Sequence, residues 1–185
     1  MLFNREICDL LFKYIIGKPS VQTKIKKNMP DDIEDIVEIV KKYFGFLLYL
    51  KGFEIKNAKR EIYQVFSVVL EGDFLICVSS DRDGYIDVTF APVNTPINEW
   101  WKWSRLQVVV YYLTNNVNYI GHYDGERNLN NELEWLSGFV AEYFASILDL
   151  YTGKQIEQYQ IKINSLNKEI DHLEIKNYST KKLGK

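Results

Sequence analysis

The chain has 185 residues, 46% of them hydrophobic and 26% charged, so it can fill a hydrophobic core and is not a disordered chain. Its 23 basic and 25 acidic residues give a net charge of −2, which argues against a dedicated nucleic-acid or anionic-membrane binder, because such proteins need a basic surface. Two cysteines cannot make a disulfide framework, and two histidines leave little material for acid–base catalysis or a transition-metal site.

Neither a signal peptide nor a membrane-spanning helix is expected. Arg5, Glu6 and Asp9 interrupt the apolar stretch that a signal peptide would need. The longest apolar runs, from 43 to 50 and from 108 to 113, are far shorter than the roughly 20 residues that span a bilayer. We therefore expect a soluble, cytoplasmic protein.

Two amphipathic helices are expected near the N-terminus. The first carries apolar residues at three- to four-residue spacing, namely Phe3, Ile7, Leu11 and Tyr14, and ends near Gly17. A polar, lysine-rich stretch follows, and Pro30 then opens a second helical pattern from Ile33 to Leu47. Acidic residues crowd the first turns of this second helix, and lysines come later, which is the order that the helix dipole favours.

After the second helix, the spacing of the apolar residues changes from the period of a helix to that of β-strands. Three runs rich in β-branched and aromatic residues, 62–70, 74–80 and 85–91, are joined by Gly-containing turns at 71–73 and 81–84. They predict an antiparallel meander, and Phe53 and Ile55 suggest an edge strand before it. In the last run, Ile86, Val88 and Phe90 share one face, which helices must cover.

Two more helices are expected after the meander. Asn98 is a plausible cap for a helix with Trp103, Leu106, Val110 and Leu113 on one face, although the valines from 108 to 110 also have strand propensity. A long helical pattern follows from Leu133 to Tyr151.

The C-terminal segment carries a heptad pattern. Its apolar positions are spaced 3-4-3-4-3: Ile156, Tyr159, Ile163, Leu166, Ile170 and Leu173. Isoleucine at a with leucine at d favours two-stranded parallel coiled coils, so these are candidate dimerisation residues. The stretch is too short to be stable alone, and it either packs back on the domain, which we favour, or pairs with a second copy.

The fold expected is therefore α+β. An antiparallel meander of three to four strands packs against several helices in one domain, 1–153. A heptad-patterned helix follows at 154–175, and 176–185 is a disordered tail.

Charge is unevenly distributed. Residues 154–185 hold seven lysines and four acidic residues, whereas residues 1–153 hold 16 basic and 21 acidic residues. The acidic residues concentrate from Glu71 to Glu99 and from Asp124 to Asp149. Acidic loops on a rigid scaffold would steer a basic partner, and the alternative is that they only keep the protein soluble.

Patterns that point to enzymatic chemistry are weak. Asp81 to Asp87 departs from the spacing of an EF-hand calcium loop, and an Asp-Gly hairpin turn explains it better. Pro30-Asp31 with Glu54-Ile-Lys56 matches a metal-dependent nuclease only superficially, because Asp31 begins a helix. Cys8 or Cys77 with His122 lacks the local signature of a catalytic pair. No cofactor and no metal site are expected.

Trp100, Trp101 and Trp103 form the densest aromatic cluster. Helical spacing assigns Trp103 to the core. Trp100 and Trp101 are adjacent and cannot easily point the same way, so one of them is a candidate exposed binding anchor.

Several stretches together suggest a family. They are 43–53 with its Gly-Phe step, 65–70, the run 74–84 with its Asp-Arg turn, 85–92, and the Trp-containing stretch 100–113. Over about residues 31–114 the chain resembles small α+β immunity proteins encoded beside bacterial polymorphic toxins, including contact-dependent inhibition systems. The resemblance implies a cytoplasmic, non-enzymatic protein that binds one cognate toxin domain and blocks its active site or folding. The heptad tail has no counterpart in that pattern.

The leading hypothesis is thus toxin neutralisation by occlusion. The candidate partner-binding residues are Glu71, Asp73, Asp81, Arg82, Asp83, Asp124 and Glu126, with Trp100 or Trp101 as the aromatic anchor. The alternative is a dimeric scaffold or regulatory module that pairs through the heptad helix. A metal-dependent hydrolase is a third, weaker possibility.

Overall fold

The computed structural model describes residues 30, 32–60, 65–81, 85–115, 128–163 and 165–169. The helix predicted at the N-terminus, part of the turn at 81–84 and the tail predicted at 176–185 lie outside the described residues. None of the helices in the described part of the chain combines the length and the apolar character that crossing a membrane requires.

Five antiparallel strands form one sheet in chain order, which confirms the predicted meander with a higher strand count. They are β1 (Glu54–Arg60), β2 (Phe66–Glu71), β3 (Phe74–Ser80), β4 (Ile86–Pro92) and β5 (Ser104–Arg105). The suggested edge strand is present as β1. The fifth strand comes from a segment predicted to be helical, and its two residues pair with Phe90 and Thr89 of β4.

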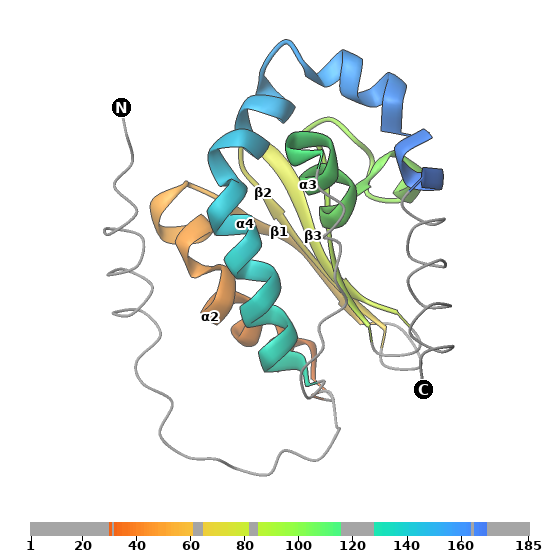
Figure 1. The fold of residues 1–185 in the computed structure, drawn as a ribbon. Coiled ribbons are helices and arrows are strands. Elements are labelled where there is room, and N and C mark those ends of the chain that lie inside the picture. The colour runs from red at the N-terminus through yellow and green to blue at the C-terminus, as the bar shows by residue number, and fades with distance from the viewer. Residues whose placement is uncertain are drawn as a thin grey trace, which may run out of the picture.

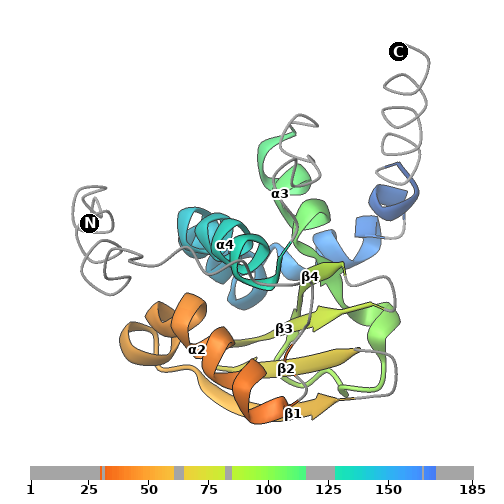
Figure 2. The same cartoon turned by 90° about the horizontal axis from the view of Figure 1, so that it is seen from below.

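Helices cover one face of this sheet. They are α2 (Ile33–Leu50), α3 (Leu106–Thr114) and α4 (Leu129–Thr152). As Figure 1 shows, α2 and α4 lie side by side across the strands, and α2 contacts mainly β1 and β2 while α4 contacts β3 and β4. Figure 2 shows α3 beyond the β4 side of the sheet.

The second predicted helix is confirmed in α2. Asp32 caps its N-terminus by accepting a hydrogen bond from the backbone N–H of Glu34 (3.2 Å), and Glu34 and Asp35 in the first turn suit the helix dipole. Its apolar stripe, which includes Ile36, Val40, Phe44 and Leu47, is fully buried.

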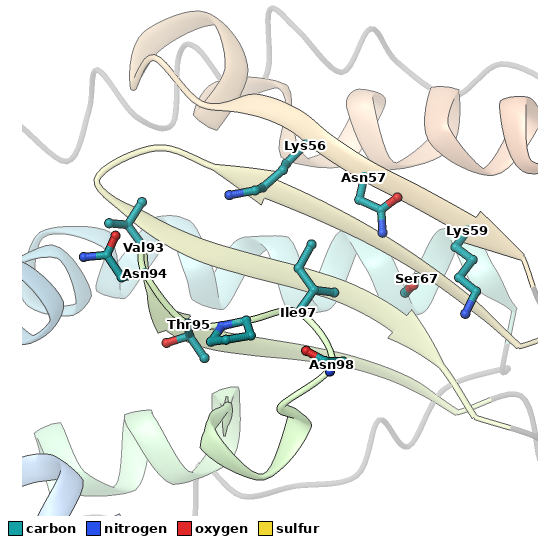
Figure 3. A pocket seen from close by; sticks show the side chains of 10 residues that line it. Lys56, Asn57, Lys59, Ser67, Val93, Asn94, Thr95, Ile97 and Asn98 are labelled. Atoms are coloured by element: carbon teal, nitrogen blue, oxygen red, sulfur yellow. The ribbon is translucent and has the colours of Figure 1, made fainter.

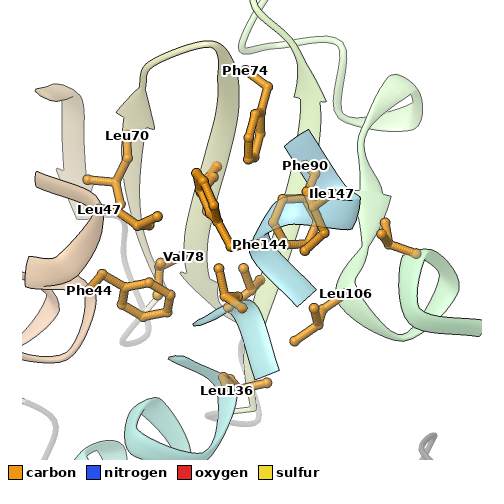
Figure 4. Packing of buried hydrophobic residues seen from close by; sticks show 14 of the residues in the cluster. Phe44, Leu47, Leu70, Phe74, Val78, Phe90, Leu106, Leu136, Phe144 and Ile147 are labelled. Carbon is orange, nitrogen blue, oxygen red and sulfur yellow. The ribbon is translucent and has the colours of Figure 1, made fainter. Parts of the chain in front are cut away.

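The core lies between α2, α4 and the sheet. Most of the helix-facing residues of β2, β3 and β4 are buried, and those of the row Val68, Val78 and Val88 are 0% exposed. Phe74 is at the centre, with ring contacts to Phe53 at 5.2 Å and to Tyr151 at 5.5 Å. Figure 4 shows Phe144 of α4 reaching toward Phe74 and Phe90 from the helix layer.

The prediction that a helix begins at Asn98 is wrong, because the helix begins later in the chain. A short 3-10 helix, η1 (Trp100–Lys102), and β5 occupy the first part of that segment, and α3 begins only at Leu106. The physical reason is the pairing of Ser104 and Arg105 with β4, which holds this part of the chain extended. The valines from 108 to 110 are helical and buried.

The heptad residues that the structure describes pack on the protein's own domain. Residues 156–163 and 165–169 are helical, and residue 164 lies outside the described residues. Tyr159 is 1% exposed, and its ring contacts Tyr112 at 4.8 Å and Tyr151 at 6.0 Å. Ile163 is also buried, and Ile156 and Leu166 pack against the same core.

A hydrogen bond fastens this segment to α3, because the Tyr111 hydroxyl donates to Glu169 Oε1 at 2.7 Å. Ile170 and Leu173 lie outside the described residues. Tyr159 and Ile163 could pair with a second copy only if the helix first left the core of its own domain.

Substituting Tyr159 should therefore test this docking. We expect Tyr159→Ala to lower the free energy of unfolding by about 3 kcal/mol or more, because it opens a cavity in the core. Ile161→Ala is the matched control, since Ile161 is 81% exposed on the same helix and should change stability by less than about 0.5 kcal/mol. Urea denaturation of the two variants measures the difference, and equal stabilities would contradict docking on the domain.

Candidate functional site

The sheet has a second face, here called the back face, which points away from α2 and α4. The register places several rows of side chains on it, of which two cross its middle. One is Lys59, Ser67, Ser79 and Asp87, and the other is Val69, Cys77, Thr89 and Arg105. Figure 3 views this face, with α4 behind the strands. Most of these side chains are polar, so this face was not built to receive a helix layer.

The segment 93–103, here called the tryptophan loop, crosses the back face between β4 and β5. Consecutive turns order it, because Thr95 N–H donates to Pro92 O (2.9 Å), Glu99 N–H to Pro96 O (3.0 Å) and Trp103 N–H to Trp100 O (3.1 Å). Glu99 and Lys102 also form an ion pair at 2.5 Å. These turns and the ion pair order the loop from within.

Trp103 anchors the tryptophan loop to the sheet. It is 8% exposed and forms a small second core with Val69, Leu75 and Ala91, against which Cys77 also packs. Trp103 is thus buried as predicted, but on the back face and outside a helix.

Both neighbouring tryptophans are exposed, whereas only one was expected to be. Trp100 is 75% exposed and Trp101 is 57% exposed, and their rings meet edge to face at 6.0 Å. Ile97 of the same loop is exposed as well. Tryptophan is highly buried on average, so two exposed rings on an ordered loop mark a candidate contact surface.

An open groove of about 720 Å³ runs beside the tryptophan loop. One wall comes from β1 and β2 and the other from the loop (Figure 3). The lining residues are Lys56, Asn57, Lys59, Ser67, Val93, Asn94, Thr95, Pro96, Ile97 and Asn98. The register of β1 shifts between Ile55 and Asn57, and this bulge lets the consecutive residues Lys56 and Asn57 both line the groove.

The described acidic residues that were predicted to bind a partner, Glu71, Asp73 and Asp81, do not all lie together. Glu71 forms an ion pair with Lys56 at 2.6 Å at the edge of the groove. Asp73 lies in the β2–β3 turn, whereas Asp81 lies at the other end of β3, about 20 Å away for a seven-residue strand. The Asp81 carboxylate accepts a hydrogen bond from Tyr85 N–H at 2.9 Å, so it stabilises its turn.

The remaining predicted partner-binding residues, Arg82, Asp83, Asp124 and Glu126, lie outside the described residues. The groove residues themselves were missed in the sequence. The signals that could have pointed to them are the two prolines, Pro92 and Pro96, and the paired lysines of β1.

We next consider whether the described side chains could act as a nucleophile or hold a metal ion. Burial raises the pKa of the Cys77 thiol to about 11, so the thiolate is scarce at neutral pH. Cys8, His122 and Asp31 lie outside the described residues, and Lys56 of the nuclease-like pattern is paired with Glu71. Within the described ranges, no group of three or more His, Cys, Asp or Glu side chains is placed to hold a metal ion.

The anchor and the exposed rings should respond differently to substitution. We expect Trp103→Ala to lower the free energy of unfolding by about 3–5 kcal/mol, because its ring is buried. Trp100→Ala and Trp101→Ala should each change stability by less than about 0.5 kcal/mol, since both rings face solvent. Thermal or urea unfolding of the three variants measures this, and a large loss for Trp100→Ala or Trp101→Ala would show a structural role instead.

The reactivity of the Cys77 thiol should be low at neutral pH and should rise as the pH approaches 11. Its pKa, raised from 9.0 to about 11, means that the folded protein holds the thiol protonated until the pH rises toward 11. In a Cys8→Ser background, we expect a thiol reagent at pH 8 to label native protein about a hundredfold more slowly than urea-unfolded protein. Equal rates would contradict the burial of this thiol.

Comparisons with protein-family models, with curated proteins and with solved structures find no match to this chain.

Proposed function

We propose that this chain is a non-enzymatic protein-binding module that docks its partner on the tryptophan loop. We further assign the partner as a cognate bacterial toxin, which the chain neutralises in the cytoplasm by occlusion, as an immunity protein does. The observation that carries the binding role is the pair of exposed rings, Trp100 and Trp101, on an ordered loop.

The energetics of recognition support this role. A tryptophan can bury about 150–250 Å² on docking, and tryptophan is among the residues most enriched at binding hot spots. The turns of the loop and the burial of Trp103 fix the position of Trp100 and Trp101 before any partner arrives. Binding therefore loses little entropy in ordering the loop, which leaves more of the contact energy for affinity.

The surroundings of the loop resemble the rim of a protein interface. Exposed Ile97 adds apolar area, and the amides and hydroxyls of the groove supply polar contacts around it. A stable complex covers roughly 800 Å² on each partner, so the loop and the groove together would form the centre of such an interface.

The assignment to toxin neutralisation is supported by the resemblance of residues 31–114 to immunity proteins. The raised pKa of Cys77 fits a protein that acts by binding, because it leaves that thiol poorly suited to nucleophilic catalysis. The acidic balance of residues 1–153 would steer a basic partner toward this body.

Capture of the partner tests the proposal. The bait is this chain, and the prey is the C-terminal domain of the protein encoded by the neighbouring upstream gene. We expect a complex whose Kd rises about 30-fold or more for the double variant Trp100→Ala/Trp101→Ala, which corresponds to the loss of a hot spot.

Tyr49→Ala is the matched control, because Tyr49 is an aromatic residue, 74% exposed, on α2, which covers the opposite face of the sheet. It should leave the Kd unchanged. The proposal fails if no complex forms, or if the double tryptophan variant binds as tightly as the unaltered protein.

A further inference from the structure

We infer that the corner between the rings of Trp100 and Trp101 binds an arginine side chain of the partner protein through cation–π contacts. This inference rests on the proposed function, because the arginine belongs to the protein that the tryptophan loop docks. It adds the chemistry of the bound side chain, and it distinguishes a cation-binding corner from a purely apolar anchor.

The geometry of the two rings suits a cation. Their planes lie at 83° to each other and their centroids are 6.0 Å apart, so the faces of both rings bound one corner. A cation in this corner can lie within about 6 Å of both centroids, which is the range of cation–π attraction. Trp100 is 75% exposed and Trp101 is 57% exposed, so a side chain from outside can reach the ring faces. Tryptophan has the most favourable ring for this contact, and here two rings act together.

The nearest cation of the chain itself is held elsewhere. Lys102 follows Trp101 directly, but its ammonium group pairs with the Glu99 carboxylate at 2.5 Å. Within the part of the chain that the structure describes, neither Trp100 nor Trp101 has a lysine or arginine over its ring. The ring faces are therefore left to a cation that comes from another molecule.

The charge of the body favours a basic side chain. Residues 1–153 hold 16 basic and 21 acidic residues, and an acidic excess attracts a basic protein and speeds their encounter. Among basic side chains, arginine fits an aromatic corner best. Its planar guanidinium stacks on ring faces, and it is more weakly hydrated than an ammonium group, so it loses less when it leaves water.

Two other occupants compete with arginine. An apolar side chain would also gain from burying the rings, because each tryptophan carries a large apolar area. An anionic membrane surface fits less well, since the acidic body would be repelled by it. Binding of arginine depends on the positive charge of the ligand and on the aromatic faces of the protein, whereas binding of an apolar side chain depends on neither. Probes and variants that change only the charge or only the aromatic face therefore separate these occupants.

Nuclear magnetic resonance of the tryptophan indole N–H groups tests the inference on the full chain. The probes are N-acetyl-arginine methylamide, its citrulline analogue, which has nearly the same shape without the charge, and the leucine analogue. We expect the arginine probe to shift the Trp100 and Trp101 signals to saturation, with a Kd at least about tenfold lower than that of either neutral probe. The Trp103 signal is the internal control and should stay in place, because this ring is buried.

A matched pair of substitutions tests the aromatic face. Trp100→Phe keeps a ring at this position, whereas Trp100→Leu keeps an apolar side chain without a ring. Read from the Trp101 signal, Trp100→Leu should weaken binding of the arginine probe at least about fivefold, and Trp100→Phe should keep it within about threefold. The inference is overturned if the arginine probe does not bind, if a neutral probe binds as tightly, or if the two substitutions act alike.

Capture of the toxin separates this inference from the proposed function. Suppose that Trp100→Ala/Trp101→Ala loses the toxin, but Trp100→Leu/Trp101→Leu binds it as tightly as Trp100→Phe/Trp101→Phe. The anchor is then apolar, so the arginine inference is wrong and the proposed function stands. If the arginine probe binds in the corner but no toxin is captured, the proposed function fails, while the preference of the corner for a guanidinium group is supported.

Discussion

The burial of Trp103 on the back face is the constraint on which the functional surface depends. Within the described residues, the helices lie on the other face of the sheet, and Trp103 of the tryptophan loop packs on the back face. Among the described residues, Trp103 packs on the apolar patch of Val69, Leu75 and Ala91, and the polar part of β1 and β2 beside it is not covered. The groove is the gap between that uncovered part and the loop, and the exposed rings lie just before the anchor. One buried ring thus fixes the groove and the two exposed tryptophans together.

Local patterns predicted most of the fold because most of its elements bury a regular stripe. Ile86, Val88 and Phe90 alternate with polar residues and face the helices, and the 3.6-residue period of α2 survives in its buried residues. β5 could not be predicted in the same way, because Trp103, Leu106 and Val110 have helical spacing. Only the long-range pairing of Ser104 with Phe90 decides between an extended chain and a helix there.

The candidate site was partly predictable. The adjacent tryptophans pointed to an exposed anchor, but the sequence could not show that Trp103 would hold both rings outward. Asp73 and Asp81 lie apart for a geometric reason, since consecutive turns of a meander are at opposite ends of a strand, here β3. Lys56 and Asn57 were missed because a bulge breaks the alternation of β1 and turns both side chains toward the groove.

The heptad segment shows the limit of a periodic pattern. An apolar stripe indicates that one side of a helix is buried, but it does not identify the element that covers it. Here the residues that specify the cover lie in α3 and α4, where Tyr112 and Tyr151 contact Tyr159 and Tyr111 bonds Glu169. Because these contacts join the segment to the helices at the β4 side, they do not involve β1, the tryptophan loop or the groove residues. In the described part of the chain, the heptad residues are therefore buried on their own domain while the back face remains accessible to a partner.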